Sequence, residues 1–273
     1  MAGNNESVSK TLLVAFLVCV VCGVVVATAA VSLRPVQAKN QLLDKRMNIL
    51  QAAGLYQEGT DVQEVFKTIE RKFVEIETGK YVDMPESYDQ RKASNDPSQS
   101  RSLSGDTDIA GIKNQAKVAE VYLAKDDSGA LSRIIVPVHG YGLWSTLYGF
   151  LALEPDANTV AGLGFYEHGE TPGLGGEVDN PKWKALWEGK KLYGEQGEVE
   201  IQVIKGTVDS RTSNAEYKVD GLAGATLTSK GVSNLLRFWV GENGLGPYLK
   251  RMQDGDTAVA SDAATPKQPE GEA

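Results

Sequence analysis

The chain has 273 residues and a formal net charge of −8, with 41% hydrophobic and 23% charged residues, a globular composition that excludes wholesale disorder. Its acidic balance, with a pI near 5.0, argues against a nucleic-acid-binding protein, which would carry a basic stripe. Two Cys and two His exclude a Cys- or His-rich metal site built by this chain alone.

The first predicted element is an apolar helix over residues 11–33. These 23 residues carry no charge, and a helix of that length spans the roughly 30 Å hydrocarbon core of a bilayer. Two interpretations stay open: a retained membrane anchor, or a signal peptide that starts near Lys10 and is cleaved after residues 27–29. The run stays apolar beyond that cleavage site, which favours a single transmembrane helix preceded by a short N-terminus, residues 1–10.

Charges beside the span bear on its orientation. Lys10 precedes it, whereas four basic residues follow it between Arg34 and Arg46. The positive-inside rule alone therefore leaves the C-terminal part of the chain in the cytoplasm.

Cys19 and Cys22 form a CxxC pair inside the apolar run, and we interpret them as packing residues because no βαβ pattern surrounds them.

Residues 34–110 are predicted to be a helical stalk followed by a polar insertion. Residues 36–53 continue the helix of the span. Residues 61–76 show a helical stripe with Asp61 as N-cap and Gly79 beyond the end, and the stripe consists of Val62, Val65, Phe66, Ile69, Phe73 and Ile76. Residues 87–109 hold few large apolar side chains, which is typical of a flexible insertion or a long loop.

Strand patterns dominate residues 111–252. Strands at 117–125 and 130–138 flank the turn sequence Asp-Asp-Ser-Gly, a hairpin signature. Further strands are predicted at 145–153, 159–165 and 198–205, and helices at 180–189 and 229–240. The predicted fold class is therefore α+β, an antiparallel sheet with packed helices, and residues 253–273 are predicted to be a disordered acidic tail.

Glycine-rich segments interrupt these elements at three places. The first, PVHGYGLWSTLYG at 137–149, combines glycines that allow close approach of a ligand with flat side chains, among them Trp144. Its alternative interpretation is a turn before a strand, with Trp144 in the core. The second segment, EHGETPGLGGE at 167–177, is too rich in Gly and Pro for a regular helix or a central strand.

Loops like the second segment often lie against ligands. For its pair His168 and Glu170, a hydrogen bond that fixes the loop is a commoner role than a catalytic one, and no third protein ligand indicates zinc. The third segment, DGLAGATLTS at 220–229, precedes a predicted helix. It predicts either a phosphate site at the helix N-terminus or an ordinary N-cap by Thr226, Thr228 or Ser229, and both remain open.

The third segment resembles the flavinylation motif D-x-x-[ST]-G-A-[TS], running from Asp220 to Thr226, with Ala223 in place of the expected Ser or Thr. Taken together with ETPGLGG, GYGLW and the single N-terminal span, the sequence resembles the C subunit of the sodium-translocating NADH:quinone reductase. That resemblance covers nearly the whole chain beyond residue 10. A related family with the same FMN-binding domain is the G subunit of the Rnf electron-transport complex.

The resemblance implies an FMN-binding domain over residues 111–252, with FMN bound covalently through a phosphoester to Thr226 by a separate flavin transferase. Small residues Gly224 and Ala225 would give access to the hydroxyl, and Asp220 would help the transferase bind metal or recognise the site. Lys230 would offset phosphate charge. The isoalloxazine ring would be lined by Trp144, Thr171, Gly173 and Leu174.

The function implied is electron relay within a membrane complex of six subunits that passes electrons from NADH to ubiquinone and exports sodium. The family places this domain in the periplasm, attached to the bacterial inner membrane, against the charge count around the span. The chain itself would bind neither NADH nor quinone, because no GxGxxG follows a predicted strand. The alternatives are the Rnf-type protein and a membrane-anchored binding module without flavin.

Overall fold

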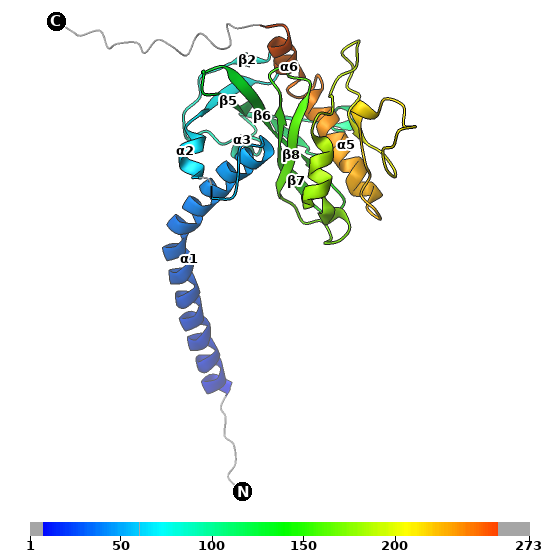
Figure 1. Cartoon of the computed structure of the whole chain (residues 1–273). Coiled ribbons are helices and arrows are strands. Elements are labelled where there is room, and N and C mark those ends of the chain that lie inside the picture. The colour runs from blue at the N-terminus through cyan, green and yellow to red at the C-terminus, as the bar shows by residue number, and fades with distance from the viewer. Residues whose placement is uncertain (1–7, 60, 256–273) are drawn as a thin grey trace, which may run out of the picture. The chain divides into compact units, whose positions relative to one another are not determined.

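The computed structural model describes residues 8–59 and 61–255, and the chain divides into two compact units after Lys45 (Figure 1). Helix α1 (Val8–Ala52) contains the predicted span, exposes its apolar side chains, and is long and apolar enough to cross a membrane. Helix α6 (Gly246–Gln253) closes the described part of the chain, and the predicted tail from residue 256 lies outside the described residues.

A six-stranded antiparallel sheet forms the second unit, with strand order β2-β1-β5-β6-β7-β8. Its last four strands confirm the sequence predictions, and Asp126 and Gly129 form the predicted β5–β6 turn. The strands are β1 (Ile69–Glu75), β2 (Lys80–Tyr81), β5 (Val118–Lys125), β6 (Leu131–Tyr141), β7 (Thr146–Leu153) and β8 (Val160–Glu167).

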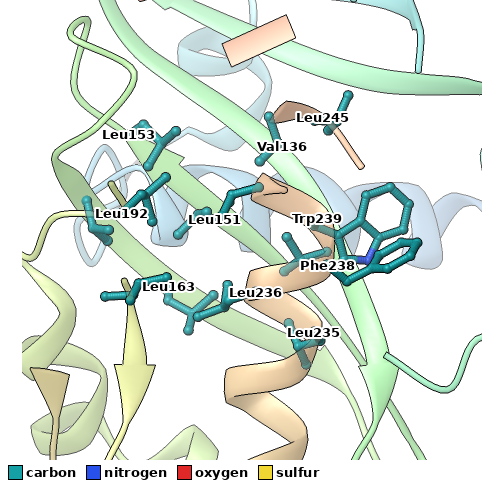
Figure 2. Close-up of a cluster of buried hydrophobic side chains, with 14 of the residues drawn as sticks. Val136, Leu151, Leu153, Leu163, Leu192, Leu235, Leu236, Phe238, Trp239 and Leu245 are labelled. Carbon is teal, nitrogen blue, oxygen red and sulfur yellow. The ribbon is translucent and has the colours of Figure 1, made fainter. Parts of the chain in front are cut away.

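Helix α5 (Thr226–Val240) packs its apolar stripe on one face of this sheet. Figure 2 shows Leu235, Leu236 and Trp239 of the helix facing strand residues that include Val136 and Leu151. Each fully buried side chain of this size contributes about 1.5–3 kcal/mol. This packing fixes the direction of α5, and with it the position of the helix N-terminus.

The opposite face of the sheet is covered by the last turns of α1, from Arg46 onward. Ile49 and Leu50 pack there with Tyr122, Ile135 and Phe150 in a second apolar cluster. The predicted helix at 180–189 is also present, as α4 (Pro181–Lys184) and a 3₁₀ turn, Ala185–Trp187. The fold is therefore the predicted α+β class.

The helix predicted over residues 61–76 is wrong beyond its first turn. Asp61 caps α2 as expected, but α2 spans only Val62–Phe66, and the chain then enters β1. All seven β1 residues pair with β5, and Gly79, at a φ of 66°, turns the chain toward β2. Branched and aromatic side chains fit a pleated surface, so pairing with a distant strand outweighs the helical spacing.

Of the two interpretations of residues 87–109, a flexible insertion or a long loop, the flexible insertion is wrong, because short regular elements interrupt the segment. It contains α3 (Gln90–Ala93), a 3₁₀ turn (Gly105–Thr107) and β3 (Ser100–Ser102), which pairs with β4 (Asn114–Ala116). The compact unit accordingly begins at Arg46 rather than at the predicted boundary, residue 111, since β1 and β2 belong to the same sheet.

Glu120, buried on β5, anchors this insertion. It forms an ion pair with Arg71 at 3.0 Å and accepts hydrogen bonds from the Gln90 amide and the Tyr122 hydroxyl. A buried carboxylate needs such partners, and two of them here, Arg71 and Gln90, are distant from Glu120 in the sequence. The strand predicted at 198–205 is much shorter in the structure. Only Gln202–Val203 form a strand, β9, because its partner β10 (Lys218–Val219) also has only two residues.

Arg91 ties the insertion to the end of β8. Its guanidinium forms two hydrogen bonds with Glu167, at 2.7 and 2.8 Å, and lies 3.9 Å from the centroid of the Tyr148 ring. Both ion-pair side chains are half-exposed, so we expect Arg91→Ala to lower the free energy of unfolding by only about 1 kcal/mol. Thermal unfolding of the variant at low and high salt checks this value; a loss of several kcal/mol would contradict it.

Candidate functional site

The three glycine-rich segments meet at the N-terminus of α5, around the carboxylate of Glu170. Its Oε1 accepts hydrogen bonds from the backbone amides of Leu143, Trp144 and Ser145, at 3.1, 3.0 and 3.3 Å. Its Oε2 accepts one from the Thr228 hydroxyl at 2.7 Å. One side chain of the second segment thus joins the first segment to the third.

Glycines make this close packing possible. A Cβ on Gly231 of α5 would lie 2.6 Å from the carbonyl oxygen of Tyr141. A Cβ on Gly175 would lie 2.6 Å from the Thr228 hydroxyl, and one on Gly224 would lie 2.9 Å from a methyl of Leu174. Real Cβ atoms do not approach this closely, so the segments could not meet with larger residues at these positions.

Glu170 is an anion within this cluster. Burial by itself raises its pKa, but the hydrogen bonds from Thr228 and from the three amides outweigh burial and hold the pKa below its usual range. The site therefore contains a fixed negative charge at neutral pH. Its partner in the second segment, His168, accepts the Glu170 amide N–H at Nδ1 and contacts Asp179 through Nε2, which fits the loop-fixing interpretation.

Within the described residues, no side chain caps the first turn of α5, whose N-cap residue is Ala225. Thr228 donates to Glu170, and Ser229 accepts the Leu222 amide N–H, so neither hydroxyl serves as a cap. The predicted N-cap by one of these side chains is thus wrong. The first-turn amides without a capping side chain and the positive end of the helix dipole suit an anion, so the phosphate site stays the prediction for this helix start.

Thr226 is the exposed hydroxyl of this helix start. Thr228 is 0% exposed and Ser229 is buried, whereas Thr226 is open to solvent at the first helical residue. Ala225 is buried behind it, and Gly224 precedes it with a φ of 72°. A reagent that approaches from solvent therefore reaches the hydroxyl of Thr226 and neither of the other two.

Large apolar side chains from each of the three segments are exposed to solvent. Trp144 is 66% exposed, which excludes the alternative that it belongs to the core, and Leu174 and Leu227 are exposed as well. Leu174 lies against Gly224, close to Thr226 in the sequence. Exposed large apolar side chains are typical of a binding surface, and the flat indole of Trp144 suits a planar ring system.

The other predicted site residues have different surroundings. The Thr171 carbonyl accepts the amides of Leu174 and Gly176, and Gly173 has a φ of 75°, so both shape the turn that presents Leu174. Lys230 is exposed on α5. The Asp220 carboxylate accepts the Val208 amide at 2.8 Å, and we therefore interpret it as a residue that holds the loop.

Sequence reasoning missed the role of Glu170 and the buried position of Thr228. A carboxylate within a Gly- and Pro-rich loop, with no Lys or Arg in that loop, was the signal available in the sequence. Such a group needs hydrogen-bond donors from elsewhere in the chain. Which donors it finds depends on the fold.

Comparisons with known proteins place this site in context. A family model described as an FMN-binding domain matches residues 142–241, which include Glu170 and Thr226. The chain is 54% identical to the C subunit of the Na(+)-translocating NADH-quinone reductase of Pseudomonas aeruginosa, over 93% of this chain and 99% of that protein. Identity to the protein of the same name from Yersinia pestis is 46%, over 92% and 96% of the two chains.

A solved structure is similar along the same part of the chain. The crystal structure of Shewanella oneidensis NqrC matches 78% of this chain and 98% of its own length. Its TM-score is 0.72 at 36% sequence identity. The fold described above is therefore shared with that protein.

Proposed function

Because the chain belongs to the family of C subunits of the Na(+)-translocating NADH-quinone reductase, we propose that it is a membrane-anchored protein that carries FMN and relays electrons. One observation carries this proposal: Thr226, in a flavinylation-like motif, presents an exposed hydroxyl at the uncapped N-terminus of a 15-residue helix. Bound FMN would supply reversible electron transfer.

The residues present fit this cofactor. The free amides at the start of α5 suit a phosphate group, and the Thr226 hydroxyl suits an ester to it. Trp144 and Leu174 offer apolar walls to the isoalloxazine ring. A covalent phosphoester, formed by a separate flavin transferase, would keep the carrier near its electron partners and prevent its loss by dissociation.

The assembly and location belong to the same proposal. The chain would work with the other members of an assembly of six subunits, passing electrons from NADH toward ubiquinone coupled to sodium export. One span within α1 supports single-pass insertion in the bacterial inner membrane. We place the FMN domain in the periplasm, as the family resemblance implies, and the flanking charges do not oppose this because large domains translocate despite them. Both relatives bear the reductase name, which favours this function over the Rnf-type alternative.

Two measurements test the proposed function. Purified full-length chain, made with the transferase, should show flavin absorbance that survives denaturation. A deletion strain should regain sodium-dependent NADH:quinone reductase activity from the wild-type gene but not from a gene with Thr226→Ala. Colourless protein that restores full activity would contradict the proposal.

Gly224→Ala should slow flavin attachment while the chain still folds. Alanine at a φ of 72° costs about 1–2 kcal/mol, and its Cβ would lie 2.9 Å from the Leu174 side chain, beside the acceptor hydroxyl. The rate of attachment, followed by intact mass, should fall about tenfold if that strain is felt at the acceptor. Gly197→Ala is the matched control, because Gly197 also has a positive φ but its Cβ would meet nothing within 4 Å. Equal rates in both variants would contradict the expectation.

A further inference from the structure

We propose that Glu170 is the positioning residue of the flavin site: its carboxylate holds the wall around Trp144, the turn around Leu174 and the start of α5 in one arrangement. This inference rests on the proposed function for its flavin, but its geometric part stands on the chain alone. The residue is not part of the D-x-x-[ST]-G-A-[TS] motif, and its role is distinct from the attachment of the phosphate.

The first support is the set of donors that converge on the carboxylate. Three successive amides, of Leu143, Trp144 and Ser145, donate to one oxygen, an arrangement that acts as an anion-binding nest. Thr228 donates to the other oxygen. Glu170 is only 5% exposed, so these donors replace the water that the charge would otherwise bind.

The second support is the shape of the space around it. A Cβ on Gly142 would lie 2.6 Å from Glu170 Oε1, and a Cβ on Gly175 would lie 2.7 Å from Oε2. Both oxygens are thus enclosed by glycine backbone from two different segments. The enclosure suits a carboxylate or a side-chain amide of the same size.

The third support is what each donor belongs to. Trp144, with its amide held by Glu170, is the most exposed large apolar side chain of the sheet domain among the described residues. Thr228 is two residues after the proposed acceptor Thr226 in the same helix, and Leu174 follows Glu170 by four residues. Without the carboxylate, three amides and a hydroxyl lose their partner at once, and the three segments lose their common attachment.

Glu170→Ala and Glu170→Gln separate this role from general stability. In Gln, the amide oxygen can accept the three backbone N–H groups while its NH₂ donates to Thr228, so the arrangement survives without the charge. Ala leaves the donors unsatisfied. Glu154→Gln is the matched control, because Glu154 pairs with Arg133 at 2.8 Å in a partly buried position outside the site.

The experiment follows hydrogen–deuterium exchange of the full-length chain in detergent, in peptides that cover residues 141–147. Loss of a hydrogen bond to a charged group corresponds to about tenfold to a hundredfold faster exchange of those amides, which we expect for Glu170→Ala. Glu170→Gln should keep most of the protection, and Glu154→Gln all of it. If Glu170→Ala does not fold, Thr228→Val, which removes one donor, should still accelerate exchange in these peptides.

The same variants are made with the transferase, and the attached flavin is followed by intact mass and visible spectrum. We expect Glu170→Ala to load more slowly and its flavin to show a solvent-like spectrum, with Glu170→Gln restored toward wild type. Unchanged exchange and an unchanged flavin spectrum in Glu170→Ala would overturn the inference. Absence of flavin from the wild-type chain would instead overturn the proposed function, while the exchange result would still decide the positioning role.

Discussion

Thr226→Ala should abolish covalent flavin while leaving the fold intact. A phosphoester requires a hydroxyl, and the other two hydroxyls of the segment, on Thr228 and Ser229, are buried and already hydrogen-bonded. Thr226 itself is exposed, so its loss should change the free energy of unfolding by less than about 0.5 kcal/mol. In-gel flavin fluorescence under denaturing conditions, combined with intact mass, measures the attachment directly.

Thr226→Ser is the companion variant, because it keeps a hydroxyl at the same backbone position. We expect it to accept flavin, and we expect thermal unfolding of both variants to match the wild type. Wild-type flavin content in Thr226→Ala would contradict the assignment of the acceptor. A Thr226→Ala protein that fails to fold would contradict the description of Thr226 as an exposed residue without a capping role.

Gly231→Ala in α5 should lower the free energy of unfolding, although alanine usually favours a helix. Its Cβ would lie 2.6 Å from the Tyr141 carbonyl oxygen and 2.9 Å from the Gly142 Cα, both of them backbone atoms that no rotamer change can move. Overpacking of this kind costs about 1–3 kcal/mol, against a gain in helix propensity of at most about 1 kcal/mol. We expect a net loss of about 1–2 kcal/mol, measured by thermal unfolding of the full-length chain in detergent.

Gly231→Ala should also lower the yield of attached flavin. Its added methyl would push α5 away from residues 141–145. Gly164→Ala on β8 is the matched control, since its Cβ would meet nothing nearer than the Ala52 Cβ at 3.9 Å. We expect that control to unfold close to the wild-type temperature and to load flavin normally. Equal behaviour of the two variants would show that the approach of α5 to the first segment is not close enough to matter.

Local signals in the sequence were sufficient for much of the fold. The turn at residues 126–129 and the patterns on either side predicted β5 and β6, since a hairpin is formed by neighbours in the chain. The spacing of apolar residues predicted α5, because its stripe matches one buried helix face. In both cases the partner or the buried face follows from residues within the element or next to it.

The failures have a common physical cause, which is pairing between distant segments. Residues 69–75 fit a helical stripe, but β5 begins more than forty residues later and offers them a full antiparallel partner. The polar segment at 87–109 holds few large apolar residues, yet Gln90 forms a hydrogen bond with Glu120 and Arg91 forms one with Glu167, both on the sheet. Composition within a window contains no information about such partners.

The candidate site was predicted in pieces and assembled only by the fold. The sequence singled out three glycine-rich segments and Thr226, but the hydrogen bonds of Glu170 reach residues 25 to 27 positions before it and 58 positions after it. The two alternatives that sequence left open, a core Trp144 and a capped α5, are decided by exposure and by hydrogen-bond partners. Neither property can be read from residue spacing alone.

The most direct test of the account is to locate the flavin on the chain made with its transferase. Cleavage after Lys218 and Lys230 yields one peptide, residues 219–230, that contains Thr226, Thr228 and Ser229 together. Tandem mass spectrometry of that peptide should place the added mass of FMN minus water on Thr226. Flavin on Thr228 or Ser229, or an unmodified peptide from a preparation with active transferase, would contradict the proposal that Thr226 carries the electron-relay cofactor.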